Sequence, residues 1–335
     1  MMSSFARRRA IIVIGLLIFL NIGVLILHVM FGERSIPPDE VLRSMFGIGN
    51  DEYRFTIHQL RLPRVLTGFL VGCGLALSGT ILQVIMKNPL ASPGVIGLNS
   101  GAAAAVVAVM VLAPAFPIRN MPWIAFGGAF IAAAAIYGLS WRKGGASSPT
   151  RMLLIGVGIS AMAGALITYL LTVGKIFRVS QASVWMAGSL YGRTWEHFWP
   201  LLHWIIILIV VVLLLSRSLD LLLLDTQSAV GLGLRVETMR LLFILISVGL
   251  AGSAVAMAGT IGFVGLMAPH MAKHLIGTRS FIRLPVAALL GGLIVILADL
   301  VGRLLFAPHE IPAGLITALI GVPYMFYLLL RFRAI

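Results

Sequence analysis

The segment Gly72-Cys-Gly-Leu-Ala-Leu-Ser-Gly-Thr-Ile-Leu-Gln83 opens a pattern of small residues that recurs 180 residues later in the chain. The matching positions are Gly72, Ala76, Gly79, Thr80, Ile81, Val84, Pro89 and Gly97 in the first copy, and Gly252, Ala256, Gly259, Thr260, Ile261, Val264, Pro269 and Gly277 in the second. Both copies are apolar enough for lipid, and repeated membrane units are typical of transport proteins. The pattern therefore favours a transport function over chance matching among Gly- and Ala-rich helices.

The composition indicates a membrane protein. Of the 335 residues, 60% are hydrophobic and 11% are charged, whereas soluble domains carry about 25% charged residues. Continuous apolar runs such as 204–215 lack the alternation of a β-barrel strand. The net charge of +14 comes mostly from Lys and Arg that flank apolar stretches, so the positive-inside rule explains it and no nucleic-acid partner is expected. We expect an all-α polytopic membrane protein.

Ten transmembrane spans fit the hydropathy. They are 10–31, 62–85, 92–112, 122–141, 152–173, 197–216, 239–259, 261–277, 285–304 and 312–330. The first follows Arg7, Arg8 and Arg9 and is too long for a signal peptide, so we expect it to be retained. The larger share of the 25 Lys and Arg residues then falls on the cytoplasmic side, with both termini. Because spans seven and eight have almost no connection, a broken pair and a total of nine spans is the alternative.

This span count makes the two copies inverted relative to each other, because the second span runs inward and the seventh runs outward. The single transmembrane domain, residues 1–335, would then hold a first repeat at 62–173 and a second at 239–330. The span 197–216 and a cytoplasmic loop at 225–235 would connect the two repeats.

Motifs for catalysis are absent from the sequence. The one Gly-Lys pair, Gly174-Lys175, precedes Ile176 and is no Walker A motif. His270 and His274 stand at i and i+4, but a third metal ligand is missing. We therefore expect no catalytic residue, no metal, no cofactor and no ATP hydrolysis by this chain. Acidic residues are sparse in the spans, which disfavours an ion-coupled carrier.

Charged residues near the predicted outer surface suggest a partner. Arg61-Leu-Pro-Arg64 opens the second span on the side where the positive-inside rule does not require arginine. Two arginines there can bind carboxylates of an acidic partner, and snorkelling to lipid headgroups is the alternative. Asp299 and Arg303 have the i, i+4 spacing of a local ion pair, which is compatible with a second role at the outer surface.

Two cytoplasmic segments have distinct turn chemistry. Residues 87–94 contain two prolines and an Asn, which predicts a rigid turn at the inner mouth. Residues 225–235 predict a short helix with Asp225 or Thr226 as N-cap and a glycine at its end. Its exposed Val and Leu suit docking into another protein, and an idle connector is the alternative.

Six segments together resemble the permease subunits of ABC importers for iron–siderophore complexes, haem and cobalamin, the type II importers. They are Arg61-Leu-Pro-Arg-Val-Leu, the segment from Gly72 to Gln83, Asn88-Pro-Leu-Ala-Ser-Pro-Gly-Val-Ile-Gly97, Gly259-Thr-Ile-Gly-Phe-Val-Gly-Leu-Met-Ala-Pro-His270, Ala298-Asp-Leu-Val-Gly-Arg303 and Glu310-Ile-Pro-Ala-Gly-Leu-Ile-Thr-Ala-Leu-Ile-Gly-Val-Pro-Tyr324. They extend from about residue 55 to the C-terminus.

The resemblance implies a type II permease fold in the bacterial cytoplasmic membrane. It implies a second permease subunit, identical or related, two ATP-binding subunits that hydrolyse ATP, and an extracytoplasmic binding protein. A ferric siderophore is the cargo that we expect, with haem or cobalamin as alternatives. An ion-coupled secondary carrier and a membrane scaffold without transport activity are the two other hypotheses.

The resemblance also implies roles for individual residues. Arginines matching Arg61, Arg64 and Arg303 meet acidic residues of the binding protein. The residues that match the ATPase-coupling helix are Ala229, Val230, Gly231, Leu232, Gly233 and Leu234. Asn88 and the stretch 147–150, which includes Thr150, match the inner gate, although Pro149 stands at a position that is polar in the family.

Overall fold

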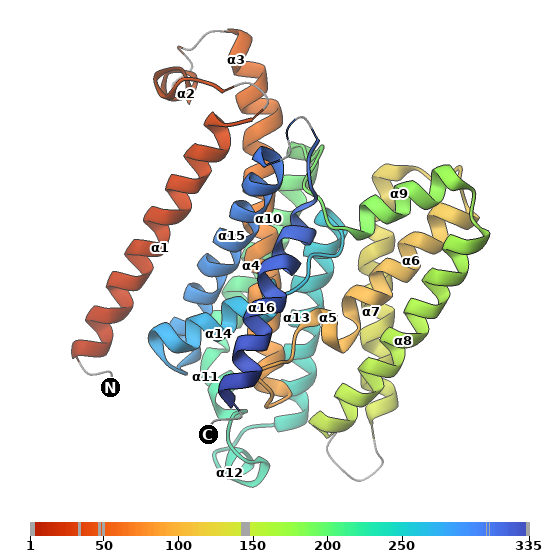
Figure 1. Cartoon of the computed structure of the whole chain (residues 1–335). Helices are drawn as coiled ribbons and strands as arrows, with labels where there is room; N and C mark the ends of the chain where they lie inside the picture. The colour runs from red at the N-terminus through yellow and green to blue at the C-terminus, as the bar shows by residue number, and fades with distance from the viewer. Residues whose placement is uncertain are drawn as a thin grey trace.

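A computed structural model describes residues 4–332 apart from 33–34, 46–47, 49–50, 142–147, 306 and 308. Figure 1 shows a bundle of helices, and the described part of the chain contains no strand. The expected all-α polytopic fold is confirmed. Ser147 of the predicted gate stretch lies outside the described residues, as do both ends of the predicted domain 1–335.

Ten helices occupy the positions of the predicted spans. They are α1 (Ser4–Met30), α4 (Leu62–Ile85), α6 (Leu98–Leu112), α7 (Met121–Ser140), α8 (Pro149–Val173), α10 (Trp195–Leu214), α13 (Val236–Ala258), α14 (Val264–Ile276), α15 (Ser280–Leu304) and α16 (Ala313–Phe332). By length and composition, seven helices within the described ranges can cross a membrane. The other three predicted spans coincide with α6, α14 and α16.

Shorter elements lie mainly at the two ends of the bundle. They are α2 (Pro38–Met45), α3 (Asp51–Phe55), the π-helix η1 (Thr56–Arg61), α5 (Pro93–Ile96), the 3-10 helix η2 (Ile118–Asn120), α9 (Ile176–Met186), α11 (Ser216–Leu221) and α12 (Thr226–Gly231). Helices α2 and α3 lie at the end opposite α12 (Figure 1). We call the end with α2 and α3 the predicted outer end, and the end with α12 the predicted inner end.

Helix α4 lies in the middle of the bundle because its glycines allow close approach. A Cβ at Gly72 would lie 2.2 Å from the carbonyl oxygen of Gly291 in α15, and one at Gly79 would lie 1.8 Å from that of Gly265 in α14. In lipid, helices associate through such close backbone contacts, because apolar side chains gain little from leaving the hydrocarbon. The small residues of the repeat therefore position α14 and α15 against α4.

The two copies of the repeat adopt different local structures. Helices α4 and α13 run antiparallel, and Ser78 Oγ lies 2.7 Å from Ser247 Oγ where they cross. In the first copy Gly79 is inside the helix, whereas in the second copy α13 ends at Ala258 and Gly259 has a φ of +72°. The sequence pattern is thus shared, but at the matching positions Gly79 and Gly259 only the second copy interrupts its helix.

The interruption between α13 and α14 supports the predicted broken pair. The 13 residues of α14 extend about 20 Å, less than the roughly 30 Å of a bilayer core. Phe263, at the start of α14, has a φ of +64° and contacts Gly321, where a Cβ would lie 2.3 Å from the ring. Thr260 Oγ1 donates to the carbonyl of Met186. Irregular backbone at membrane depth requires protein partners of this kind.

The predicted third span, 92–112, does not form one continuous helix. The segment forms α5 and α6, which meet at Gly97 with a φ of +99°. A Cβ at Gly97 would lie 3.0 Å from the carbonyl oxygen of Gly156 in α8. The left-handed conformation and the close contact both require glycine, so the chain bends sharply before α6.

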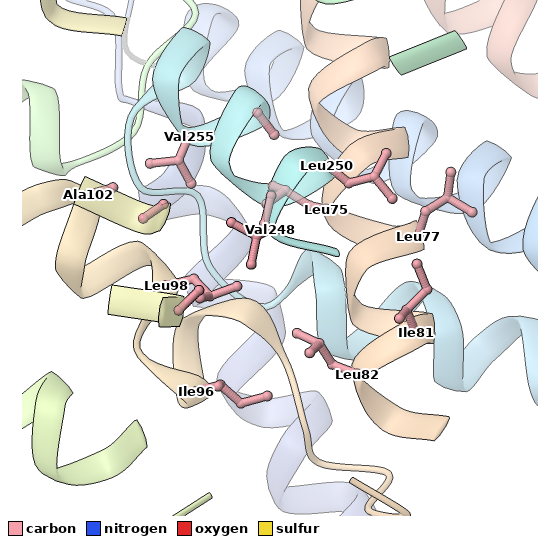
Figure 2. Close-up of a cluster of buried hydrophobic side chains, with 14 of the residues drawn as sticks. Leu75, Leu77, Ile81, Leu82, Ile96, Leu98, Ala102, Val248, Leu250 and Val255 are labelled. Atoms are coloured by element: carbon pink, nitrogen blue, oxygen red, sulfur yellow. The ribbon is translucent and has the colours of Figure 1, made fainter. Parts of the chain in front are cut away.

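An apolar core holds the central helices together. Figure 2 shows Leu75 and Leu82 of α4 with Ile96, Leu98 and Val248 from α5, α6 and α13. These five side chains are each at most 3% exposed. The core fixes the backbone to which the polar side chains at both ends of the bundle are attached.

Candidate functional site

A buried cluster of charged side chains joins three helices at the predicted outer end. Arg64, in the first turn of α4, donates from Nε and Nη2 to the two carboxylate oxygens of Asp299 in α15, each at 2.8 Å. Its Nη1 donates to Glu310 Oε1 at 3.0 Å. His28 Nε2, from α1, lies 2.7 Å from Asp299 Oδ2. We call His28, Arg64, Asp299 and Glu310 the outer charge cluster.

The outer charge cluster is almost fully enclosed by protein. Arg64 is 8% exposed, Asp299 is 2% exposed and His28 is fully buried. The two parallel bonds between Arg64 and Asp299 have the fork geometry that gives the strongest ion pairs. A buried carboxylate is stable only with such a partner, so the pair ties α4 to α15 and, through His28, to α1.

The other two predicted docking arginines contact the end of α1. Arg61 Nη1 donates to the carbonyls of Val29 at 2.6 Å and Met30 at 3.0 Å. Arg303 Nη2 donates to the carbonyl of Phe31. The last carbonyls of a helix lack intrahelical donors and carry partial negative charge. Two cations from α15 and η1 therefore cap the C-terminus of α1.

These contacts decide two sequence-based alternatives. The predicted local ion pair of Asp299 with Arg303 is wrong, because the carboxylate faces Arg64 and His28 instead. Headgroup snorkelling is wrong for Arg61 and Arg64, since both side chains are buried against protein. The docking role of Arg61, Arg64 and Arg303 stays a prediction.

Sequence reasoning missed His28 and Glu310. A histidine in an apolar span is a signal for a buried polar partner, and His28 carries that signal near the end of α1. Glu310 lies in a connection far from Arg64 in sequence, and no local pattern links the two residues. Only the arrangement of α4 and α15 brings them together.

The predicted capped helix at the inner end forms as expected. Asp225 is the N-cap of α12, and its Oδ1 accepts a hydrogen bond from the Ser228 backbone N–H at 2.9 Å. Gly233 has a φ of +85° just beyond the helix end. Ala229 is buried, whereas Val230 and Leu232 are 57% and 64% exposed. Helix α12 and its C-cap residue Leu232 therefore expose two apolar side chains.

The predicted gate residues lie in separate elements. Asn88 Oδ1 accepts a hydrogen bond from the Leu90 backbone N–H at 2.9 Å, which closes the predicted rigid turn. Thr150 is exposed in the first turn of α8, next to Pro149. No hydrogen bond in the described part of the chain joins Asn88 to Thr150 directly, and their role in an inner gate stays a prediction.

The histidine pair on α14 forms a short polar chain. His270 Nε2 lies 3.3 Å from His274 Nε2, and His270 Nδ1 lies 2.7 Å from the Tyr324 hydroxyl on α16. Within the described ranges, no group of three or more His, Cys, Asp or Glu side chains is arranged to hold a metal ion.

Known proteins resemble this chain over its whole length. The probable siderophore transport system permease protein YfhA of Bacillus subtilis (strain 168) is 41% identical, covering 98% of this chain and 97% of the relative. The Fe(3+)-citrate import system permease protein YfmE of the same organism is 39% identical over 98% and 97%. The ferric enterobactin transport system permease protein FepG of Escherichia coli (strain K12) is 35% identical over 98% of each chain.

A solved structure agrees with these relatives. A protein assigned to the metal-chelate type of ABC transporter, in an inward-facing conformation, has a TM-score of 0.85 and 30% identity, covering 95% of this chain and 98% of its own. The FecCD transport family matches residues 16–331, which include both repeats, the outer charge cluster and α12. This chain belongs to the FecCD transport family, the permeases of ABC importers.

Proposed function

We propose that this chain is the membrane-spanning subunit of an ATP-driven importer that carries a ferric siderophore across the bacterial cytoplasmic membrane. The observation that carries the proposal is the full-length similarity to permeases named for iron chelates. Haem and cobalamin are less favoured cargoes, because the similar permeases reported above are all named for iron chelates or siderophores. Both termini are proposed to be cytoplasmic, as the distribution of Lys and Arg predicts.

Two ATP-binding subunits are proposed to supply the energy. Helix α12 supports their docking site, because it projects from the predicted inner end (Figure 1). Its Val230 and the C-cap residue Leu232 are also exposed. An exposed apolar pair on a short capped helix fits a hydrophobic cleft in a partner. Residues 229–234 are thus the proposed coupling residues.

A second permease subunit, identical or related, is proposed to complete the translocation path. Repeats at 62–173 and 239–330 are proposed as the two halves of each subunit, with the inner gate near Asn88 and Thr150. The helix breaks at Gly97 and Gly259 support this division, because each repeat contains a glycine with positive φ where helices can move relative to one another.

Arg61, Arg64 and Arg303 are proposed to meet acidic residues of the binding protein. All three arginines are buried, which restricts how a partner can reach them. A carboxylate of the partner can reach Arg64 most directly by replacing Glu310, whose side chain is 25% exposed, whereas the Asp299 side chain is 2% exposed. Docking would then exchange one carboxylate for another without leaving the arginine unpaired.

An ion-coupled carrier is the rival function. Such carriers use ionisable residues deep in their spans, and here Asp299 is already paired with Arg64 and His28. A scaffold without transport activity is disfavoured by the membership of the transport family.

Reconstitution tests the proposal. The chain is assembled with its ATP-binding subunits and binding protein in proteoliposomes, and uptake of radiolabelled ferric siderophore is measured. We expect uptake that needs ATP and the binding protein. A matched complex whose ATP-binding subunits cannot hydrolyse ATP is the control. Uptake driven by an ion gradient, with this chain alone, would contradict the proposal.

A further inference from the structure

Polar contacts tie the segment that carries α12 to the helix bundle at two points. Lys87, just after α4, donates from Nζ to the carbonyl of Leu224 at 2.6 Å. Leu224 immediately precedes Asp225, the N-cap of α12. On the other side, Asp220 in α11 accepts a hydrogen bond through Oδ1 from the backbone N–H of Ser280 at 2.9 Å. Ser280 is the first residue of α15.

These contacts continue into the buried interior. Arg283 lies one turn after Ser280 and is 4% exposed, and its Nη2 donates to Gln83 Oε1 of α4 at 3.0 Å. Gln83 is 7% exposed, and its Nε2 donates to the carbonyl of Leu266 in α14 at 3.4 Å. Gln83 and Lys87 are four residues apart, so one end of α4 contacts the α12 segment, α14 and α15.

General helix energetics do not account for the polar residues at these positions. Arg283 is in the first turn of α15, where the helix dipole disfavours a cation. Lys87 has a φ of +47°, which non-glycine residues rarely adopt. A buried arginine with a neutral amide as its hydrogen-bond partner also gives up much of its hydration. Departures from local preference of this kind concentrate at functional sites.

We propose that Gln83, Lys87, Asp220 and Arg283, which we call the inner polar network, are positioning residues that transmit the displacement of α12 to α4, α14 and α15. This inference rests on the proposed function, since it needs ATP-binding subunits that move α12. Gln83 contacts α14 at Leu266, in its first turn directly after the break at 259–263, so a displacement there can be taken up by that break. The network thus connects the ATPase contact to the interrupted helix of the second repeat.

The test compares coupling rather than activity alone. Lys87→Met keeps the side-chain stem and removes the donor to Leu224. Lys87→Arg retains a donor, and Lys273→Met, which changes an exposed lysine of α14 at the same end, is the matched control. Each variant complex is reconstituted with its ATP-binding subunits and binding protein, and ferric siderophore transported per ATP hydrolysed is measured together with subunit assembly.

We expect Lys87→Met to assemble and to lower transport per ATP by about fivefold or more, in the range of typical coupling between sites. Lys87→Arg should recover most of this loss, and Lys273→Met should equal the wild type. Gln83→Met should produce a similar loss. Since the residues act in series, the double variant should lose no more than the worse single variant.

Two results overturn the inference. One is a wild-type transport ratio in Lys87→Met and Gln83→Met. The other is loss of assembly in both variants, which would assign these residues to folding alone. Failure of the proposed function is distinguishable, because the wild-type complex itself would then show no ATP-dependent uptake.

Discussion

Removal of Arg64 tests whether the outer charge cluster is built into the fold. Arg64→Met keeps much of the aliphatic stem but leaves Asp299, which is 2% exposed, without its bidentate partner. Loss of one member of a buried ion pair costs about 3–5 kcal/mol, because the remaining charge is uncompensated. This corresponds to a change of at least about 100-fold in the unfolding equilibrium.

The double variant Arg64→Met/Asp299→Leu sharpens the test. Replacing both members of a buried pair by apolar residues is often neutral or stabilising. Here His28 and Glu310 lose a partner as well, and one unsatisfied buried polar group costs about 1–3 kcal/mol. We therefore expect the double variant to be destabilised less than Arg64→Met alone.

The chain carries its own reporter for this measurement. Cys73 is the sole cysteine and is 3% exposed in the middle of the α4–α15 contact. Thermal unfolding in detergent can be followed with a thiol-reactive fluorescent dye, since the thiol reacts only after α4 separates from its neighbours. Arg64→Met should unfold several degrees below the wild type.

A wild-type unfolding midpoint for Arg64→Met would refute the reasoning, because it would show that Asp299 tolerates the loss of its partner. The docking role is tested separately with Glu310→Gln, which weakens the competitor for Arg64 and leaves the pair with Asp299 in place. If docking exchanges carboxylates, this variant should bind the binding protein more tightly than the wild type. Weaker binding would argue against the exchange.

Gly72→Ala would place a Cβ 2.2 Å from a backbone oxygen of α15, so we expect a loss of about 1–3 kcal/mol in the dye assay, whereas Gly138→Ala, with open space around it, should be neutral or stabilising. Asp225→Ala removes the N-cap of α12 and should weaken co-purification with the ATP-binding subunits, while Asp225→Asn should preserve it. Hydrogen bonds from Ser228 lower the pKa of the Asp225 carboxyl group. The stability that this cap gives to α12 is therefore fully present above the ordinary pKa of aspartate, and it is lost only as the pH falls through the lowered pKa. Co-purification should accordingly not change between about pH 8 and about pH 5. Asn88→Ala opens the inner turn and should reduce uptake more than Asn88→Asp, which keeps the acceptor.

The sequence predicts the helices well because apolar runs and glycine patterns are local signals. The close helix contacts at Gly72 and Gly79 of α4 could be expected from the small residues of the repeat. The start of α12 could be predicted from Asp225 as N-cap, and its end from the glycine that follows. The break at Gly97 could not be predicted as firmly, because glycine is common inside membrane helices. Only the contact with α8 explains why the chain bends there.

The partners of buried charges were the least predictable part. Spacing suggested Asp299 with Arg303, since an i, i+4 pair is the obvious local choice. The carboxylate instead meets Arg64, from a helix more than 200 residues earlier. Long-range pairs of this kind depend on helix packing, which a single sequence does not encode as a pattern. For the same reason, the sequence did not predict the contact between Gln83 and Arg283.

Helices α4 and α15 are joined at three levels, and this restricts which parts of the chain can move. The Arg64–Asp299 pair holds the predicted outer end. Close glycine backbones hold the middle, near Gly72, and the Gln83–Arg283 contact holds the predicted inner end. Two helices fixed at both ends and the centre behave as one rigid unit, because separating them would expose buried charge at either end. We therefore expect motion during transport to occur relative to this pair, with the backbone breaks near Gly97 and between α13 and α14 as two places that can take it up.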